Sequence, residues 1–344
     1  MNWRQGYVAT YRLYSVNQST WGDGDEIDGL VSASVTKDGD SELIEDASIS
    51  IDVDNGETIK GYVRLVLEAK NNSGMARADI GTFLVTAPKR SINNNLVTLD
   101  LECYSVLKPA ADKLLPPGWY FPKGGDPIVG AYELLSDSLK CPVEYSESGL
   151  STDKIKVAES NETALSMAQY LLEDTGYFIK IDGKGRVSIA KKPFTYNIVF
   201  DTVDNDVLMP NITDETDIFE VPNILRVTDS SGNYETIYNN DDNSSTSISA
   251  LGWEKWAAEQ LELDYGESLV GKGSERMEKL SKSTRKISYT REFNPDVKLN
   301  DIGLYLLPQQ GIVGAFRVIS QSIELGAGVT VNEISEFETE NWRA

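Results

Sequence analysis

The sequence contains no histidine among its 344 residues. This absence excludes Ser-His-Asp and Cys-His nucleophile systems, His-ligated zinc or iron, and imidazole acid–base chemistry. Cysteine is scarce too, because Cys103 and Cys141 are the only two, lie 38 positions apart and match no metal or redox spacing. We expect both thiols to be buried and reduced, in a protein that matures in a reducing cytosol.

Long apolar runs are missing as well. The N-terminal residues lack the apolar core of a signal peptide, and no later stretch approaches the ~18 apolar residues of a membrane helix. Basic residues are few, with 32 Lys and Arg against 54 Asp and Glu, so the formal net charge is −22. Because such a surface repels a phosphate backbone, we expect no specific nucleic-acid binding, and the lack of a long apolar run predicts no membrane insertion.

Hydrophobic residues make up 40% of the chain, which is enough for two or three domains of ordinary size. In residues 1–107, aromatic and β-branched residues alternate with other residues along short segments such as 7–16, 30–36 and 47–53. Polar, turn-forming stretches separate these segments, a pattern typical of a β-barrel or sandwich. We therefore predict a first β-domain over residues 1–107.

Proline and glycine become frequent after that domain and mark a boundary. Asp126 is a candidate N-cap with Pro127 at the first helical position, and a second helix is expected from about Asn161. A strand pair follows over residues 177–190. Residues 108–195 therefore predict an α+β domain.

Residues 196–344 return to β-structure, with a hairpin predicted over 223–238 and closing strands up to Phe337. Inside this part, Trp253 and the apolar residues after it have helical spacing, so a helical segment is expected over 253–285. The predicted fold class is α+β and β-dominated, with two β-domains and an α+β domain between them.

One short sequence pattern, which we call the internal echo, occurs twice in the chain. Phe83-Leu84-Val85-Thr86 is followed, 14 residues after Phe83, by Val97-Thr98-Leu99, and Phe316-Arg317-Val318-Ile319 is followed, 13 residues after Phe316, by Val329-Thr330-Val331. Either these are the same hairpin in two copies of one domain, or they are two unrelated hairpins rich in Val and Thr.

The segment Gly266 to Lys272 fits the first seven positions of a phosphate-binding P-loop. The eighth position, which needs a Mg²⁺-ligating Ser or Thr, is Gly273. The residues before the segment have helical spacing, whereas a P-loop joins a strand to a helix. We interpret the segment as a glycine hinge between two helical stretches.

Acidic clusters suggest calcium, because hard oxygen ligands suit that ion. The densest cluster is Asp23, Asp25, Glu26 and Asp28, but Ile27 stands where the EF-hand pattern needs a ligand. Looser groups are Asp201, Asp204 and Asp206, and Asp241 with Asp242. Solvated loop acids are the expected interpretation, with one ion site as the alternative.

Enzymatic chemistry finds little support. A pair of carboxylates can run a glycosidase without histidine, yet 54 acidic residues offer no particular pair. Ser151 to Lys154 matches Ser-x-x-Lys, a pattern too short to indicate a site without its partner motifs. We predict no catalytic, cofactor-binding or metal-binding residue and no cofactor.

Taken in order, the segments of this chain resemble the baseplate hub proteins of contractile phage tails and phage-tail-like bacteriocins. The likeness rests on residues 31–43 and 47–53 in the first part, 162–165, 176–178 and 182–187 in the middle, and 221–227, 293–295, 300–302 and 314–318 near the C-terminus.

The resemblance implies two tail-tube-like β-barrel domains in each subunit and a homotrimeric ring, whose pseudo-sixfold surface meets a hexameric tube. The implied function is structural and not enzymatic: an adaptor joining the tail tube to the central spike. The implied partners are the tube protein, the spike protein and other baseplate proteins. The implied location is a virion tail or tail-like particle assembled in the bacterial cytoplasm. Some relatives of non-contractile tails carry an added lysozyme or peptidase domain. Because this sequence ends seven residues after Phe337, we expect no such domain and no lytic role.

A ring of three chains has a formal charge of 3 × (−22) = −66. Part of this charge is expected to line the channel through which DNA passes in the phage form, where like charge avoids phosphate contacts; the alternative is that it only aids solubility. Two other functions stay open: a carbohydrate-binding or receptor-binding tail module, and a histidine-free glycoside hydrolase.

Overall fold

The structure is a computed structural model that describes residues 1, 3, 6–52, 59–93, 96–173, 175–201, 208–217, 221–240, 244, 246–261, 263, 267–281, 284–326 and 329–337. The chain forms two compact units. Unit 1 comprises residues 1–211 and 289–344, and unit 2 comprises residues 212–288. The chain passes from one unit to the other within strands β13 (Leu208–Asp217) and β17 (Thr284–Glu292).

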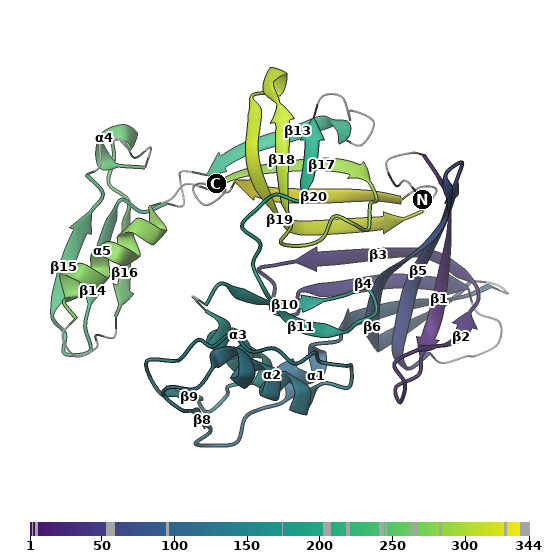
Figure 1. The fold of residues 1–344 in the computed structure, drawn as a ribbon, viewed down its shortest axis with the longest axis horizontal. Helices are drawn as coiled ribbons and strands as arrows, with labels where there is room; N and C mark the ends of the chain where they lie inside the picture. The colour runs from purple at the N-terminus through teal and green to yellow at the C-terminus, as the bar shows by residue number, and fades with distance from the viewer. Residues whose placement is uncertain are drawn as a thin grey trace. The chain divides into compact units, whose positions relative to one another are not determined.

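The first β-region of unit 1 has strands that pair in the order β3-β4-β7-β6-β5-β1-β2 (Figure 1). Their bounds are β1 Val8–Val16, β2 Asp23–Ile27, β3 Leu30–Asp38, β4 Glu45–Asp52, β5 Gly61–Asn71, β6 Gly74–Asn93 and β7 Leu96–Ser105. Residues at every second position point inward, as in β4, where Glu45, Ala47, Ile49 and Ile51 are all buried. Ala47, Ile49 and Ile51 join a core with Leu13, Leu65, Phe83 and Leu101.

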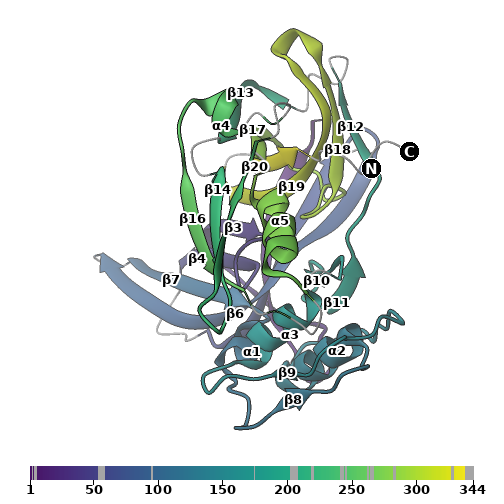
Figure 2. The same ribbon diagram turned by 90° about the vertical axis from the view of Figure 1, so that its left-hand side faces the viewer.

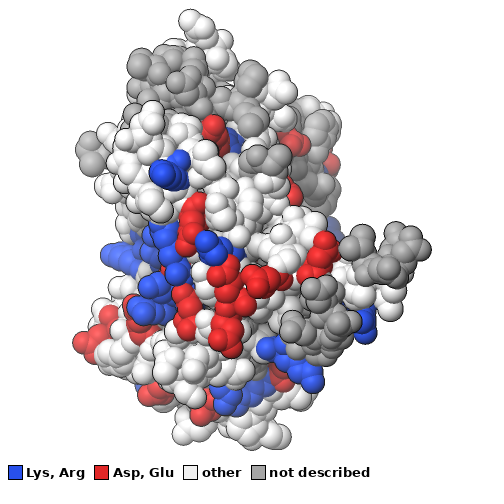
Figure 3. Space-filling view, turned by 90° about the vertical axis from the view of Figure 1, so that its right-hand side faces the viewer, with Lys and Arg blue, Asp and Glu red and all other residues white. Residues whose placement is uncertain are grey.

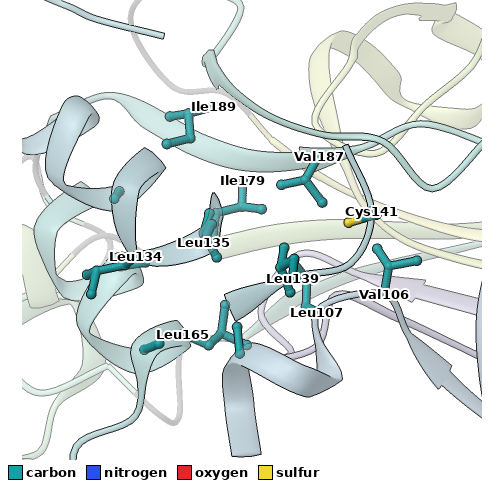
Figure 4. Packing of buried hydrophobic residues seen from close by; sticks show 14 of the residues in the cluster. Val106, Leu107, Leu134, Leu135, Leu139, Cys141, Leu165, Ile179, Val187 and Ile189 are labelled. Atoms are coloured by element: carbon teal, nitrogen blue, oxygen red, sulfur yellow. The ribbon is translucent and has the colours of Figure 1, made fainter. Parts of the chain in front are cut away.

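A helical layer and a hairpin follow in the chain. The elements are α1 Lys108–Asp112, β8 Tyr120–Phe121, α2 Pro127–Ser138, β9 Lys156–Val157, α3 Ala164–Leu172, β10 Tyr177–Ile181 and β11 Val187–Lys191. The helices pack their apolar faces against the β10–β11 hairpin, as the close-up in Figure 4 shows for Leu135, Ile179 and Val187. The Asp126 carboxylate caps α2 by accepting a hydrogen bond from the Ile128 backbone N–H, as predicted.

Both cysteines are buried and form no disulfide. The sulfur of Cys141 lies in the core drawn in Figure 4, close to Leu139. Burial raises the pKa of each thiol to about 12, so neither is ionised at neutral pH. The expectation of two buried, reduced thiols is confirmed.

The C-terminal β-region of unit 1 contains β12 Ile198–Asp201, β17, β18 Ile302–Leu307, β19 Ile312–Leu325 and β20 Val329–Phe337, with the short helix η1 Pro308–Gln310 between β18 and β19. Aromatic rings fill its interior: Tyr305 stacks on Phe200 with ring centroids 4.8 Å apart and meets the edge of Phe316 at 5.3 Å. Strand β19 also pairs with β3, so the two β-regions form one continuous sheet.

The two β-regions repeat one strand order. In the first β-region, the consecutive strands β3 to β7 lie in the sheet in the order β5-β6-β7-β4-β3. In the second, the strands β13, β17, β18, β19 and β20 lie in the order β18-β19-β20-β17-β13, which is the same arrangement. In the first β-region, a short turn connects β3 and β4. In the C-terminal β-region, the segment that contains unit 2 connects the corresponding strands β13 and β17.

The echo around Phe83 and Phe316 extends to backbone detail. Each Phe precedes a β-bulge, since pairing shifts between Val85 and Ala87 in one hairpin and between Val318 and Ser320 in the other. A glycine stands two residues before each Phe, and a Cβ there would lie 2.3 Å from the Phe83 ring at Gly81, and 2.5 Å from the Phe337 ring at Gly314. Because composition alone does not place a bulge and a glycine at matching positions, these features support duplication over two unrelated hairpins.

Unit 2 contains a three-stranded sheet in the order β15-β14-β16 and two helices. The bounds are β14 Ile224–Thr228, β15 Tyr234–Tyr238, α4 Ile248–Leu251, β16 Trp256–Gln260 and α5 Leu269–Leu280. Helix α5 lies along one face of the sheet (Figure 2), with Leu269 and Met277 against Leu225 and Val227. Gly273 allows this approach, since a Cβ there would lie 2.9 Å from a methyl of Val227.

The β-dominated α+β fold class is confirmed. The prediction of a helix from Trp253 to Leu261 is wrong, because residues 256–260 form β16, which pairs in parallel with β14. The helix expected to reach Arg285 ends at Leu280 instead, and residues 284–292 form β17. The division into domains at residues 107 and 195 stays a prediction.

Candidate functional site

The acidic cluster predicted as a possible ion site lies on and beside β2, where arginines pair with Asp23 and Glu26. The Asp23 carboxylate accepts hydrogen bonds from Arg64 Nη1 at 2.5 Å and Arg77 Nη2 at 2.7 Å, and Glu26 accepts one from Arg12 Nη1 at 2.6 Å. Within the described ranges, no three acidic or cysteine side chains come together as metal ligands. The cluster is therefore part of an ion-pair surface.

The P-loop-like segment does follow a strand, β16, so the helical context that we expected is wrong. Its residues still do not form a phosphate loop, because Gly271 and Lys272 lie inside α5, after the N-cap Ser268. The Lys272 ammonium donates to Glu267 Oε2 at 2.8 Å. The prediction of a glycine hinge between two helices is also wrong, because the strand β16 precedes the segment and Gly271 lies within α5.

The remaining sequence candidates do not converge on one site. Ser151 is exposed, and the Thr152 hydroxyl beside it donates to the Pro122 carbonyl at 3.0 Å, which closes a loop. The positions Asp204, Asp206, Asp241, Asp242 and Gly266, and the side chain of Asp201, lie outside the described residues.

Sequence reasoning missed a buried arginine that joins two parts of unit 1. Arg64 on β5 is 2% exposed and lies in the otherwise apolar run from Tyr62 to Leu67. Its guanidinium donates to Thr82 Oγ1 at 3.0 Å and to the carbonyl of Lys184 at 3.0 Å, in the turn of the β10–β11 hairpin. An arginine inside an apolar strand was the available signal, since arginine is rarely buried without partners.

Two further features fix the same turn to the first β-region. The Trp21 indole N–H donates to the Lys184 carbonyl at 2.8 Å. Gly183 lies so close to β6 that a Cβ would stand 1.9 Å from the Asp79 carbonyl oxygen. The hairpin is thus held rigidly by hydrogen bonds and by close backbone packing.

A second buried network lies in the C-terminal β-region. Arg291 on β17 and Glu333 on β20, 1% and 0% exposed at their side chains, form an ion pair in which Arg291 Nη2 lies 2.5 Å from Glu333 Oε2. Gln321 Nε2 donates to the same oxygen at 2.8 Å, and the Tyr289 hydroxyl donates to Glu333 Oε1. Burial and the nearby Glu333 charge raise the pKa of Tyr289 well above its usual value. The network joins strands β17, β19 and β20.

The outer surface offers two candidate interaction areas. Acidic and basic side chains lie interleaved on the face drawn in Figure 3, as they do where Arg12 bridges Glu26 and Glu68 on β1, β2 and β5. In unit 2, the face of the sheet opposite α5 carries exposed Tyr234 and Trp256, and the Arg226 guanidinium carbon lies 5.2 Å from the Trp256 ring centroid. We call this second area the aromatic face, made of Arg226, Tyr234, Tyr238 and Trp256.

Comparisons with known proteins identify the fold. No protein-family model matches the sequence, and a search of curated proteins finds no match. Among solved structures, the 43 kDa tail protein of prophage MuSo2 from Shewanella oneidensis has a TM-score of 0.69 at 12% identity, over 94% of this chain and 95% of that chain. The tail protein from Neisseria meningitidis MC58 has a TM-score of 0.67 at 12% identity, over 98% of both chains.

This chain has the fold of those tail proteins. A chain of the half-lidded Francisella PdpA–VgrG complex is also similar, with a TM-score of 0.58 at 10% identity, and this chain matches over 99% of its length but only 60% of that chain. In the described part, no helix is long and apolar enough to span a membrane.

Proposed function

We propose that this protein is a structural subunit of a phage tail or tail-like particle, located in the baseplate. The observation that carries the proposal is a tail-protein fold that extends over almost the whole chain, 94% and 98% in the two comparisons. The networks around Arg64 and around Arg291 and Glu333 hold strands together, which suits a structural subunit.

The finer proposal is a homotrimeric hub that joins the hexameric tail tube to the central spike. The repeated strand order supports it, since three chains with two copies each present six similar sheets to a sixfold partner. Other baseplate proteins are the remaining partners, and the particle assembles in the bacterial cytoplasm. The similarity to a chain of a VgrG-containing complex agrees with a position near a spike.

The mass of the assembled species tests this proposal. Light scattering or native mass spectrometry is expected to give 3 × 38.0 = 114 kDa for the purified chain, or, after mixing with its tube and spike proteins, a complex that contains three copies of the chain. A stable monomer under both conditions would count decisively against the hub.

The aromatic face favours one second function, carbohydrate binding by a receptor-recognition module. Exposed Tyr234 and Trp256 offer flat apolar surfaces for sugar rings, while Arg226 supplies donors beside them. Saturable binding of the intact chain to a glycan array, lost in the Tyr234→Ala and Trp256→Ala variants, would establish this function. Glycan binding that persists in both variants would exclude the aromatic face as its site.

A further inference from the structure

A cavity of about 120 Å³ lies inside unit 1, between the first β-region, the β10–β11 hairpin and the C-terminal β-region. Strands β3, β4, β6, β10 and β19 and the loop of residues 293–299 contribute to its wall. The apolar part of the wall includes Ile44, Ile80, Phe178, Phe293 and Ile323.

Glu45 is the exceptional residue of this wall. It is 3% exposed, and its Oε1 atom accepts no hydrogen bond from any described residue. The nearest cation is Lys37, whose Nζ stands 3.6 Å from a Glu45 carboxylate oxygen and donates instead to the Ile80 carbonyl at 2.9 Å. A buried acceptor without a donor is unfavourable, so the site is incomplete as it stands.

The backbone beside Glu45 is strained. Ile44 has φ +65°, a conformation that β-branched residues rarely adopt. Hydrogen bonds hold it there, since the Asp38 N–H donates to the Ile44 carbonyl at 2.7 Å and the Ile44 N–H donates to the Ser41 carbonyl at 3.1 Å. Strain maintained by the surrounding fold is a feature of functional positions.

The charged residues around the cavity include equal numbers of cations and anions. The charged residues of its wall are the cations Lys37, Lys180 and Lys298 and the anions Glu45, Asp79 and Asp182. A ligand with a net charge would disturb this balance beside the buried Glu45 carboxylate, so a neutral ligand fits best. The volume of the cavity approaches the roughly 150 Å³ of an engineered protein cavity that binds benzene. The cavity therefore has room for a ligand of about one aromatic ring.

We propose that this cavity binds a neutral, ring-sized ligand with one O–H or N–H donor, which donates to the Glu45 carboxylate while the ring contacts the apolar wall. Phenols represent this chemical class. The site is independent of the proposed baseplate role.

A pair of probes that differ only in the donor tests the proposal. Binding of 4-fluorophenol and of fluorobenzene to the intact chain is measured by ¹⁹F NMR titration at pH 8. This pH is chosen because burial raises the pKa of Glu45 to about 7, so the carboxylate is ionised. We expect 4-fluorophenol to bind about tenfold more tightly, as a donor to a buried charged acceptor allows. Equal binding of the two probes, or no binding of 4-fluorophenol at millimolar concentration, would overturn the proposal.

Variants locate the site. Glu45→Leu removes the acceptor at similar volume and is expected to abolish the preference for 4-fluorophenol, whereas Glu45→Gln keeps a carbonyl acceptor and retains part of it. The control Glu42→Leu, at an exposed position three residues away, is expected to leave both affinities unchanged. Thermal unfolding confirms that each variant is folded. A preference that survives in Glu45→Leu would place the binding site elsewhere.

Discussion

Arg64 Nη2 lies 3.0 Å from the carbonyl oxygen of Lys184, 120 residues further along the chain. This contact ties the middle α+β segment to the first β-region, because Arg64 belongs to β5 and Lys184 to the turn of the β10–β11 hairpin. The same guanidinium also donates to Thr82, Asp23 and the Trp21 carbonyl, so its loss removes several hydrogen bonds at once, including the buried one to the Trp21 carbonyl.

Replacing Arg64 is therefore expected to be costly. We predict that Arg64→Ala lowers the free energy of unfolding by about 3 kcal/mol or more, as for other broken buried ion pairs. Arg77→Ala removes the other arginine bound to Asp23, but from a side chain that is 41% exposed, and should cost less than about 1 kcal/mol. Chemical denaturation measures both values. Similar losses in the two variants would show that burial of Arg64 does not govern its contribution.

The close approach at Gly183 gives a steric prediction. Gly183→Ala puts a methyl group 1.9 Å from the Asp79 carbonyl oxygen, so the hairpin must shift away from β6. We expect a loss of about 1–3 kcal/mol in the free energy of unfolding. Gly6→Ala is the matched control, since nothing lies within 4 Å of its added Cβ. Equal stability of the two variants would contradict the packing at this turn.

Glu45 makes stability depend on pH. Burial raises its pKa from 4.5 to about 7, so the folded state holds a proton that the unfolded state releases between these values. The stability contributed by this protonation is fully present below pH 4.5 and is lost as the pH rises through about 7. The loss amounts to about 3 kcal/mol, an order-of-magnitude figure.

The difference in unfolding free energy between the wild type and Glu45→Gln isolates this effect, because the other acids cancel. We expect the wild type to lose stability relative to the variant between pH 5 and pH 8. Glu42→Gln, at an exposed site, should show no such trend. A pH-independent difference for Glu45→Gln would mean that its carboxyl group titrates normally.

The pair formed by Arg291 and Glu333 should be strongly coupled. Either Arg291→Met or Glu333→Leu leaves one buried charge unpaired and should cost about 3–5 kcal/mol, whereas the double variant should cost much less than the sum. A double-mutant cycle by chemical denaturation gives the coupling energy. Additive losses would show that the two side chains act independently.

In the proposed ring, acidic side chains are expected to line the channel. With a Debye length of about 8 Å at physiological salt, only acids that face the lumen act on a passing polyanion. A structure of the assembled ring decides the matter. A neutral or basic channel wall, with acids confined to the exterior, would leave solubility as the role of the −22 charge.

Local patterns predicted much of the fold. Alternating residues predicted strands such as β4 and β19, and the Asp126–Pro127 pair predicted the start of α2. Strand β16 was missed because Trp253, Trp256 and Ala257 also fit a helical period, and only pairing with β14 decides between the two. The separate unit 2 was missed because β13 and β17, which flank it, are far apart in the sequence.

The sequence contained a pattern from which the buried charged residues could have been predicted. Glu45 is in phase with Ala47 and Ile49 on β4, and Glu333 is in phase with Val329 and Val331 on β20. A charge on the apolar side of a strand indicates a buried partner or an unfilled site. Which of the two applies depends on neighbours from distant strands, and only the folded structure brings these together.

Unit 2 has a consequence for symmetry. It occupies the connection between β13 and β17, whereas the matching strands β3 and β4 are joined by the short turn of residues 39–44. In a ring of three chains, six matching connections would therefore alternate between short and long around the circle. The sheets would present a nearly sixfold surface on one side, while the inserts would restore true threefold order wherever they project. In the proposed ring, a single insertion in one of the two β-regions would thus be sufficient to match a sixfold partner on one side and threefold geometry on the other.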